Sequence, residues 1–175
     1  MIAPQPCFVQ CYNRRVPEDG AHILSLLSDS PGKTQQFGER LGRLIRPGDV
    51  IGLSGELGAG KTTLAVGIGH GWGAREAVNS PTFVLVNEYS RVDGSRLYHV
   101  DAYRLRDAAD ADSIALWDLL SDGNSAVMIE WPERVDETLP AERLWVELAW
   151  RGESERHLRL EGRGARYEAL IAGLA

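Results

Sequence analysis

Apolar residues along the chain gather in short runs, some with the spacing of strands and some with the spacing of helices. The runs at 22–28, 50–54 and 126–129 are short and bounded by turn residues, as strands are. Helical spacing begins at Pro31, which follows a capping serine, and again at Thr62. The run 126–129 is apolar without interruption, so we expect a strand that is buried on both faces.

Two turn sequences predict hairpins. Asp93-Gly94 and Arg151-Gly152-Glu153-Ser154 each lie between segments of strand character. The expected strands are 83–91 with 96–101 in the first hairpin and 144–150 with 157–160 in the second. Further helices are expected at 108–120 and 167–174. The alternate glycines from Gly67 to Gly73 are expected to fray or cap the helix that begins at Thr62.

Length and composition indicate one globular domain with a short extension. The chain has 175 residues, of which 43% are hydrophobic and 25% charged, as is ordinary for globular proteins. Residues 1–20 contain three prolines and no clear period, so we expect a flexible, loosely attached extension before a single domain at 21–175. No apolar run approaches the ~20 residues of a membrane helix, and the first residues do not resemble a signal peptide. The expected location is the cytoplasm, with no membrane partner.

Charge narrows the class of partner. The formal net charge is −6, whereas a broad nucleic-acid footprint needs clustered lysine and arginine on a basic domain. If RNA is involved, we expect another protein to hold it. The only lysines are Lys33 and Lys61, so arginine serves at almost every other basic position. Lys61 is therefore expected where only an ammonium group serves.

A phosphate-binding loop is the strongest chemical signal. Residues 55–62 read Gly-Glu-Leu-Gly-Ala-Gly-Lys-Thr and match G-x-x-x-x-G-K-S/T at every fixed position, between a predicted strand and a predicted helix. The glycines let backbone N–H groups curl around a phosphate, and the helix N-terminus adds a partial positive charge. Lys61 would reach the β- and γ-phosphates, and Thr62 would hold Mg²⁺. The expected fold is a P-loop NTPase, α/β, with a mainly parallel sheet flanked by helices and with antiparallel hairpins.

This loop normally has an acidic partner at the end of a neighbouring buried strand. Two positions offer one, because Glu130 follows the strand 126–129 and Asp101 ends the strand 96–101. Each carboxylate has the alternative of capping a strand end or pairing with an arginine, so the residues alone leave the choice open. Trp131, directly after Glu130, is either a packed aromatic or a wall of a nucleotide or partner site.

The first hairpin brings another candidate group to the same edge. Because its strands are antiparallel, Ser80-Pro81-Thr82 before it should lie beside Asp101 after it. If the strand 96–101 runs with the strand that leads to the phosphate loop, this edge faces the nucleotide. Thr82 then resembles a switch threonine that senses the γ-phosphate, and Asp101 is placed to orient the attacking water. A simple turn is the alternative for 80–82.

Four segments, taken in order, resemble the TsaE family, the small P-loop ATPases of bacterial tRNA threonylcarbamoyladenosine (t6A) biosynthesis. The segments are Gly55 to Thr63, Ser80-Pro81-Thr82-Phe83, His99-Val100-Asp101-Ala102-Tyr103-Arg104-Leu105 and Glu130-Trp131-Pro132. Together they are far more specific than the phosphate loop alone. The resemblance covers residues 22–160 and departs from the family pattern at Glu56, where aspartate is expected.

The resemblance implies a cytoplasmic ATPase that acts with two partner proteins, TsaD and TsaB. In the family, these partners transfer a threonylcarbamoyl group to adenosine 37 of tRNA, and ATP hydrolysis by the family's ATPase resets their complex. The chain would then meet tRNA only through that complex, which fits its acidic charge. Hydrolysis is expected to be slow for the chain alone and faster with the partners.

The resemblance also implies roles for single residues. Thr62 and Glu130 would hold Mg²⁺, while Asp101, Thr82 and Lys61 would act at the γ-phosphate. The residues expected to bind ATP are Gly55, Leu57, Gly58, Ala59, Gly60, Lys61, Thr62, Thr63 and Trp131. The helix start at 31–34 would lie near the nucleotide. Arg151 and Arg156 are further candidates for phosphate contact, although no motif supports them.

Two other classes of function stay open at this point. A small-molecule kinase uses the same loop, but it needs an acceptor pocket and an arginine-bearing lid. No lid is evident after Glu130, whereas Arg104 and Arg106 are available to an acceptor. A nucleotide-dependent binding module would switch between states with negligible hydrolysis. Phosphate transfer to an added acceptor favours the kinase, and slow hydrolysis that rises with partners favours the ATPase.

Overall fold

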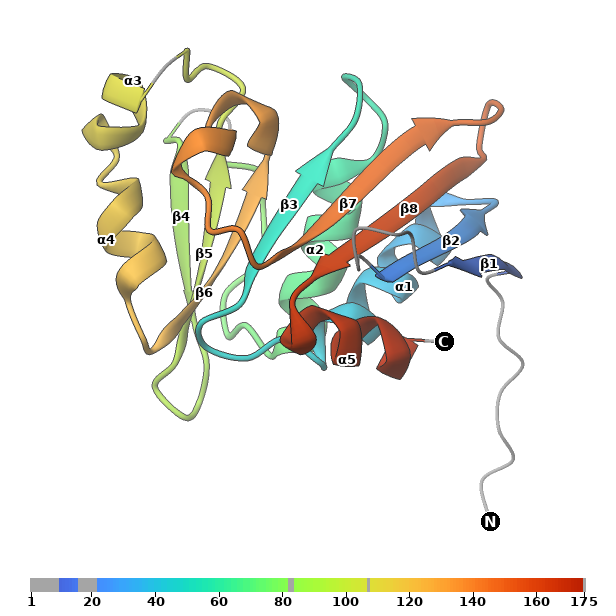
Figure 1. Cartoon of the computed structure of the whole chain (residues 1–175), viewed down its shortest axis with the longest axis horizontal. Helices are drawn as coiled ribbons and strands as arrows, with labels where there is room; N and C mark the ends of the chain where they lie inside the picture. The colour runs from blue at the N-terminus through green and yellow to red at the C-terminus, as the bar shows by residue number, and fades with distance from the viewer. Residues whose placement is uncertain (1–9, 16–21, 82–83, 107, 175) are drawn as a thin grey trace.

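One mixed sheet organises the fold (Figure 1), and the computed structural model describes residues 10–15, 22–81, 84–106 and 108–174. The strands are β1 (Gln10–Arg15), β2 (His22–Ser28), β3 (Val50–Ser54), β4 (Val86–Ser90), β5 (Arg96–Asp101), β6 (Ser125–Glu130), β7 (Arg143–Trp150) and β8 (Arg156–Arg163). The helices are α1 (Pro31–Gly42), α2 (Lys61–Trp72), α3 (Ala108–Ser113), α4 (Leu116–Ser121) and α5 (Ala165–Leu174), with 3₁₀ turns η1 (Pro132–Arg134) and η2 (Asp136–Thr138). None of the helices in these ranges is long and apolar enough to span a membrane.

The parallel part of the sheet lies at its centre. Across the sheet the strand order is β1-β2-β8-β7-β3-β6-β5-β4. Strands β7, β3, β6 and β5 run parallel, and the pairs β1–β2, β2–β8, β7–β8 and β4–β5 are antiparallel. The predicted α/β class with a parallel centre and antiparallel hairpins is confirmed. Because β5 and β6 both run with β3, the carboxyl ends of these three strands share one edge.

The central strands are buried on both faces. In β6, Ala126 and Met128 belong to one apolar cluster, and Val127 and Ile129 belong to another. The first cluster includes α1, α2 and α5, while the second includes residues of α3, α4 and the segment after β6. Every residue of β6 is buried, as the uninterrupted apolar run predicts. This packing sets where β6 ends in the sheet, and therefore where Glu130 lies.

The glycines of α2 have a different role from the one expected. Instead of fraying the helix, Gly67 and Gly71 lie inside it, and only Gly73 caps it in the left-handed conformation. A Cβ at Gly67 would lie 2.1 Å from the carbonyl oxygen of Gln35, and one at Gly71 would lie 2.0 Å from that of Glu39. The glycines inside α2 therefore let this helix approach the backbone of α1. The prediction that the glycines fray or cap the helix is confirmed for Gly73 and wrong for those before it.

The expected helix 108–120 is broken into α3 and α4. Ala115 adopts a φ of 52° between them, and the next residue, Leu116, is fully buried against the second apolar cluster. Helical periodicity continues through both pieces, so the sequence pattern does not reveal the break. Ala115, in the left-handed conformation, turns the chain so that Leu116 can reach the core. This turn costs some backbone strain, because a positive φ is unfavourable for a residue other than glycine.

The expected N-terminal extension contains an edge strand. Residues 10–15 form β1 and pair antiparallel with β2, with an irregularity in register between Cys11 and Asn13. This segment is therefore attached to the sheet, contrary to the loose attachment that was expected for it. The first hairpin also differs in extent, because β4 begins at Val86, and Phe83 lies outside the described residues.

Helix α5 fastens the start of β3, the strand that leads to the phosphate loop. The Val50 N–H donates to the Tyr167 hydroxyl at 2.8 Å. Arg166 donates to both carboxylate oxygens of Asp49, at 2.9 and 2.6 Å. Burial raises the pKa of Tyr167 to about 12, so this hydroxyl stays protonated at any physiological pH.

Candidate active site

The phosphate loop connects the end of β3 to the first turn of α2. Gly60 precedes the helix in the left-handed conformation, with a φ of 104°, which suits glycine. A Cβ at Gly55 would lie 2.3 Å from the carbonyl oxygen of Leu148 on β7, so this position also excludes a side chain. Behind the loop, Arg156 donates from Nε to the carbonyl oxygen of Ala59 at 3.1 Å and stacks on the Trp150 ring. The loop is thus held from the β7–β8 side.

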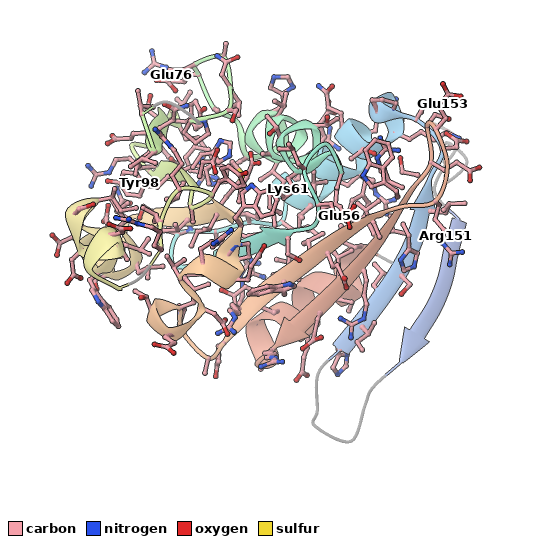
Figure 2. The ribbon with its side chains drawn as sticks, turned by 90° about the horizontal axis from the view of Figure 1, so that it is seen from above. Glu56, Lys61, Glu76, Tyr98, Arg151 and Glu153 are labelled. Carbon is pink, nitrogen blue, oxygen red and sulfur yellow. The ribbon has the colours of Figure 1, made fainter. Side chains whose placement is uncertain are left out.

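Lys61 folds back over its own loop. Its Nζ donates to the carbonyl oxygens of Gly55, at 2.7 Å, and Glu56, at 2.9 Å. The same Nζ lies 3.7 Å from the centroid of the Trp131 ring, within the range of a cation–π interaction. Figure 2 shows Lys61 and Glu56 near each other at the start of α2. Burial lowers the pKa of Lys61, and the nearby carboxylates, with Glu130 foremost, oppose that shift.

Thr62 and Glu130 meet beside Lys61. The Thr62 hydroxyl lies 3.1 Å from each carboxylate oxygen of Glu130. Glu130 ends β6 and is only 3% exposed, and His99 on β5 lies 3.0 Å from its Oε1. Of the two acidic candidates, Glu130 is the one in contact with the phosphate-loop threonine. This contact is the arrangement that a P-loop magnesium site requires.

Asp101 stands next to Glu130 at the same sheet edge. The two residues are paired in register between β5 and β6. Asp101 is 6% exposed, and its Oδ1 accepts from the Tyr103 N–H at 3.0 Å. Its backbone N–H donates to the carbonyl oxygen of Leu85 at 2.9 Å, and Leu85 lies just after the 80–82 segment. Asp101 therefore lies beside the start of the first hairpin, as expected. Thr82 itself lies outside the described residues.

Lys61, Thr62, Asp101 and Glu130 all line one pocket, which has a volume of about 320 Å³. Its lining consists of Leu57, Gly58, Gly60, Lys61, Thr62, Thr63, Ser80, Asp101, Tyr103, Glu130 and Trp131. Of the residues expected to bind ATP, Gly55 and Ala59 are outside this lining, since both face β7 and β8. Trp131 lines the pocket and also packs against the second apolar cluster, so it is a packed aromatic, and its role at a nucleotide or partner site stays a prediction.

The loop that carries Ser80 is anchored by Tyr89 of β4. The Tyr89 hydroxyl accepts from the Asn79 N–H at 3.0 Å and donates to the Asn79 carbonyl oxygen at 2.9 Å. Asn87 adds a hydrogen bond to the same carbonyl and to the tyrosine oxygen. These contacts hold the backbone just before Ser80, which faces the pocket.

The donor set fits Mg²⁺ bound together with a nucleotide. Within the described ranges, no three His, Cys, Asp or Glu side chains gather as a metal site. Thr62 and Glu130 supply one hydroxyl and one carboxylate, and Mg²⁺ in such sites takes its remaining oxygen ligands from phosphate and water. The described residues thus offer a metal one hydroxyl and one carboxylate, and phosphate and water would complete its ligands.

A profile of the family described as "Threonylcarbamoyl adenosine biosynthesis protein TsaE" matches residues 28–158. This range includes every candidate residue of the pocket. The chain belongs to the TsaE family.

Relatives and a solved structure agree with this assignment. The chain is 37% identical to the tRNA threonylcarbamoyladenosine biosynthesis protein TsaE of Bacillus subtilis over 147 residues, which cover 83% of this chain and 90% of that protein. It is 42% identical to the protein of the same name from Streptomyces coelicolor, over 76% of this chain and 93% of that one. The crystal structure of Bacillus subtilis YdiB superposes with a TM-score of 0.73 and 32% identity, and the match covers 88% of this chain and 95% of that one.

Two side chains of the TsaE motifs received no role from the sequence, and two arginines outside those motifs lie elsewhere than expected. Tyr103 lines the pocket, and its ring centroid lies 5.0 Å from that of Trp131. His99 contacts Glu130 from within the sheet. Arg156 was a candidate for phosphate contact, yet it binds the loop backbone, and Arg151 is exposed on the β7–β8 hairpin, away from Lys61 (Figure 2). The i, i+2 spacing of His99, Asp101 and Tyr103 was the available signal for the first two.

Proposed function

We propose that the chain is a Mg²⁺-dependent ATPase that serves threonylcarbamoyl modification of adenosine 37 in tRNA, where ATP hydrolysis drives turnover of a TsaD–TsaB complex. The contact of Thr62 with both carboxylate oxygens of Glu130, next to Lys61, carries the ATPase part of the proposal. The names of the curated relatives carry the tRNA part. The acidic charge supports a protein that reaches tRNA through partners.

Each side chain has a chemical task in this proposal. Lys61 exchanges its two backbone carbonyl acceptors for phosphate oxygens, which are stronger partners for an ammonium group. Thr62 and Glu130 hold Mg²⁺, which supplies positive charge to the phosphates when bound. Asp101, buried beside Glu130, orients the attacking water and accepts its proton. Trp131 and Tyr103 form an aromatic wall that limits access of water to the pocket.

A small-molecule kinase is the second candidate, and the described part of the chain favours it less. The segment directly after Glu130 forms the compact turns η1 and η2, and Val135 and Leu139 of this segment are buried in the second apolar cluster. Arg106, one of two arginines available to an acceptor, is paired with Asp110.

The test is ATP hydrolysis by the purified chain, measured alone and with purified TsaD and TsaB. We expect slow hydrolysis alone and a rise of about tenfold or more with both partners, as a partner that completes or orders a catalytic site can give. Phosphate release and transfer to small acceptors are followed in parallel with labelled ATP. No rise with partners, together with phosphate transfer to an acceptor, would replace the ATPase by the kinase. If the chain binds ATP but shows neither stimulated hydrolysis nor phosphate transfer, it would instead be a nucleotide-dependent binding module.

A magnesium titration separates the two carboxylates. Glu130→Ala is expected to raise the Mg²⁺ concentration for half-maximal hydrolysis about 10- to 100-fold, because a group that ligates or orients the metal is lost. Asp101→Ala should instead lower the rate at saturating Mg²⁺ about 100-fold with little change in half-saturation, because its role concerns the water. Asp118→Ala, which removes an exposed carboxylate on α4, is the matched control. The reverse ranking of the half-saturation values would exchange the two roles.

A further inference from the structure

His99 is a buried histidine that the proposed chemistry does not yet use. It lies on β5, two residues before Asp101, and it is fully buried. Its Nε2 lies 3.0 Å from Oε1 of Glu130, whose side chain is only 4% exposed. The contact crosses from β5 to β6. His99 is paired in register with Met128, on the same sheet face as the Asp101–Glu130 pair, and it is not among the residues that line the pocket.

A neutral imidazole ring has one donor nitrogen and one acceptor nitrogen. Because an ionised carboxylate only accepts, we assign Nε2–H of His99 as the donor to Glu130, which leaves Nδ1 as the acceptor. Within the described part of the chain, Nδ1 is buried and has no hydrogen-bond partner. Burying a polar atom without a partner costs free energy, and an apolar side chain would fill this place without that cost. Packing alone does not explain a histidine here, whereas the contact with Glu130 does.

Glu130 needs such a contact because two partners compete for it. Thr62 approaches both of its oxygens from the phosphate loop. The Lys61 ammonium also attracts it, and among the neighbouring carboxylates Glu130 contributes most to raising the pKa of that lysine. A glutamate has several rotatable bonds, and turning toward Lys61 would draw both groups away from the positions that a metal and a phosphate require. A donor on the sheet side restrains Oε1 and prevents this turn.

We propose that His99 is a positioning residue for the metal: its Nε2–H holds Oε1 of Glu130 so that the carboxylate stays directed at Thr62 and the pocket. This inference rests on the proposed function, since it assigns the metal to Thr62 and Glu130. It means that the increase in ATP affinity produced by Mg²⁺ depends on a residue that touches neither ATP nor the metal. Outer contacts of this kind commonly change metal affinity 10- to 100-fold.

The experiment measures binding, not only hydrolysis. The dissociation constant of a fluorescent N-methylanthraniloyl-ATP is determined in Mg²⁺ and in EDTA for wild type, His99→Leu and His99→Gln. Leucine removes the donor and keeps an apolar volume, while the glutamine amide can reach the position of Nε2 and donate again. His99→Leu should weaken binding about tenfold in Mg²⁺ and leave binding in EDTA unchanged. His99→Gln should restore binding in Mg²⁺ to within about threefold of wild type.

A double-mutant cycle with Glu130→Ala tests the role of His99 separately from the proposed role of Glu130 in binding Mg²⁺. If His99 acts through Glu130, adding His99→Leu to Glu130→Ala should have no further effect on binding in Mg²⁺. An equal loss of affinity in Mg²⁺ and EDTA, or an unchanged affinity in both, would overturn the role of His99 while that of Glu130 stands. If Glu130→Ala itself leaves the Mg²⁺ effect intact, the metal assignment fails and this inference fails with it.

A second variant serves as a control in case His99→Leu does not fold. His99→Asn keeps a polar side chain of smaller volume, whose amide ends short of Glu130, and it should show the same selective loss in Mg²⁺ as His99→Leu. Thermal melting followed by circular dichroism identifies any variant that is unfolded at the assay temperature. A selective loss in the folded asparagine variant supports the proposal even if the leucine variant does not fold, and full binding in that variant would overturn it.

Discussion

Lys61→Ala is expected to reduce ATP hydrolysis, with or without partners, by about 100-fold or more. The Lys61 side chain lines the pocket, where two backbone carbonyl oxygens and the face of Trp131 hold its ammonium group. Among the described residues of the lining, no other side chain carries positive charge. Removal of one fixed donor to a charged transition state commonly costs 10²- to 10³-fold in rate. Hydrolysis is measured by phosphate release under saturating Mg²⁺ and ATP.

Two further variants make this result specific. Arg46→Ala also removes one positive charge, from an exposed turn before β3, and it should hydrolyse ATP like wild type. Lys61→Arg keeps the charge but places a planar, larger group over Trp131 and cannot make the same point contact with phosphate, so it should recover little activity. Full activity of Lys61→Ala would remove the basis of the ATPase assignment. Activity of Lys61→Arg near wild type would show that charge alone suffices.

Local signals in the sequence predicted the parts of the site that depend on local structure. The phosphate loop, the strand before it and the helix after it follow from a fixed pattern of glycines between two apolar segments. Glu130 is a candidate because an uninterrupted apolar strand ends there, and the hairpin turn at Asp93-Gly94 places Asp101 beside the 80–82 segment. In each case the controlling interactions lie within a few residues, or follow from the parallel pairing of neighbouring strands.

Contacts between distant elements set the features that the sequence did not reveal. The break at Ala115 depends on where Leu116 meets the core, and the pairing of residues 10–15 depends on the free edge of β2. The hydrogen bond from His99 to Glu130 joins residues on two strands, so only their register brings them together. The packing role of the glycines inside α2 is not evident from local sequence, because their packing partner is another helix, about 30 residues earlier in the chain.

The close contact of α1 with α2 positions the phosphate loop, because α2 begins at Lys61. Gly38 and Gly42 of α1 face Gly67 and Gly71 of α2, or the backbone beside them, at distances that leave no room for a Cβ. A Cβ at Gly42 would lie 2.1 Å from the carbonyl oxygen of Ile68. The neighbours here are main-chain atoms of helices, which cannot turn aside as a side chain can. Small residues thus set the distance between the two helices.

Gly67→Ala is accordingly expected to lower the free energy of unfolding by about 3 kcal/mol or more, because the added methyl group would lie 2.1 Å from the Gln35 carbonyl oxygen. Gly69→Ala should cost less, since its methyl group meets the side chain of Val78. Gly32→Ala, in the first turn of α1 with nothing within 4 Å, should instead stabilise by about 0.5–1 kcal/mol. Urea denaturation followed by circular dichroism gives all three values. Equal effects at Gly67 and Gly32 would mean that helix propensity, and not the contact between α1 and α2, determines the result.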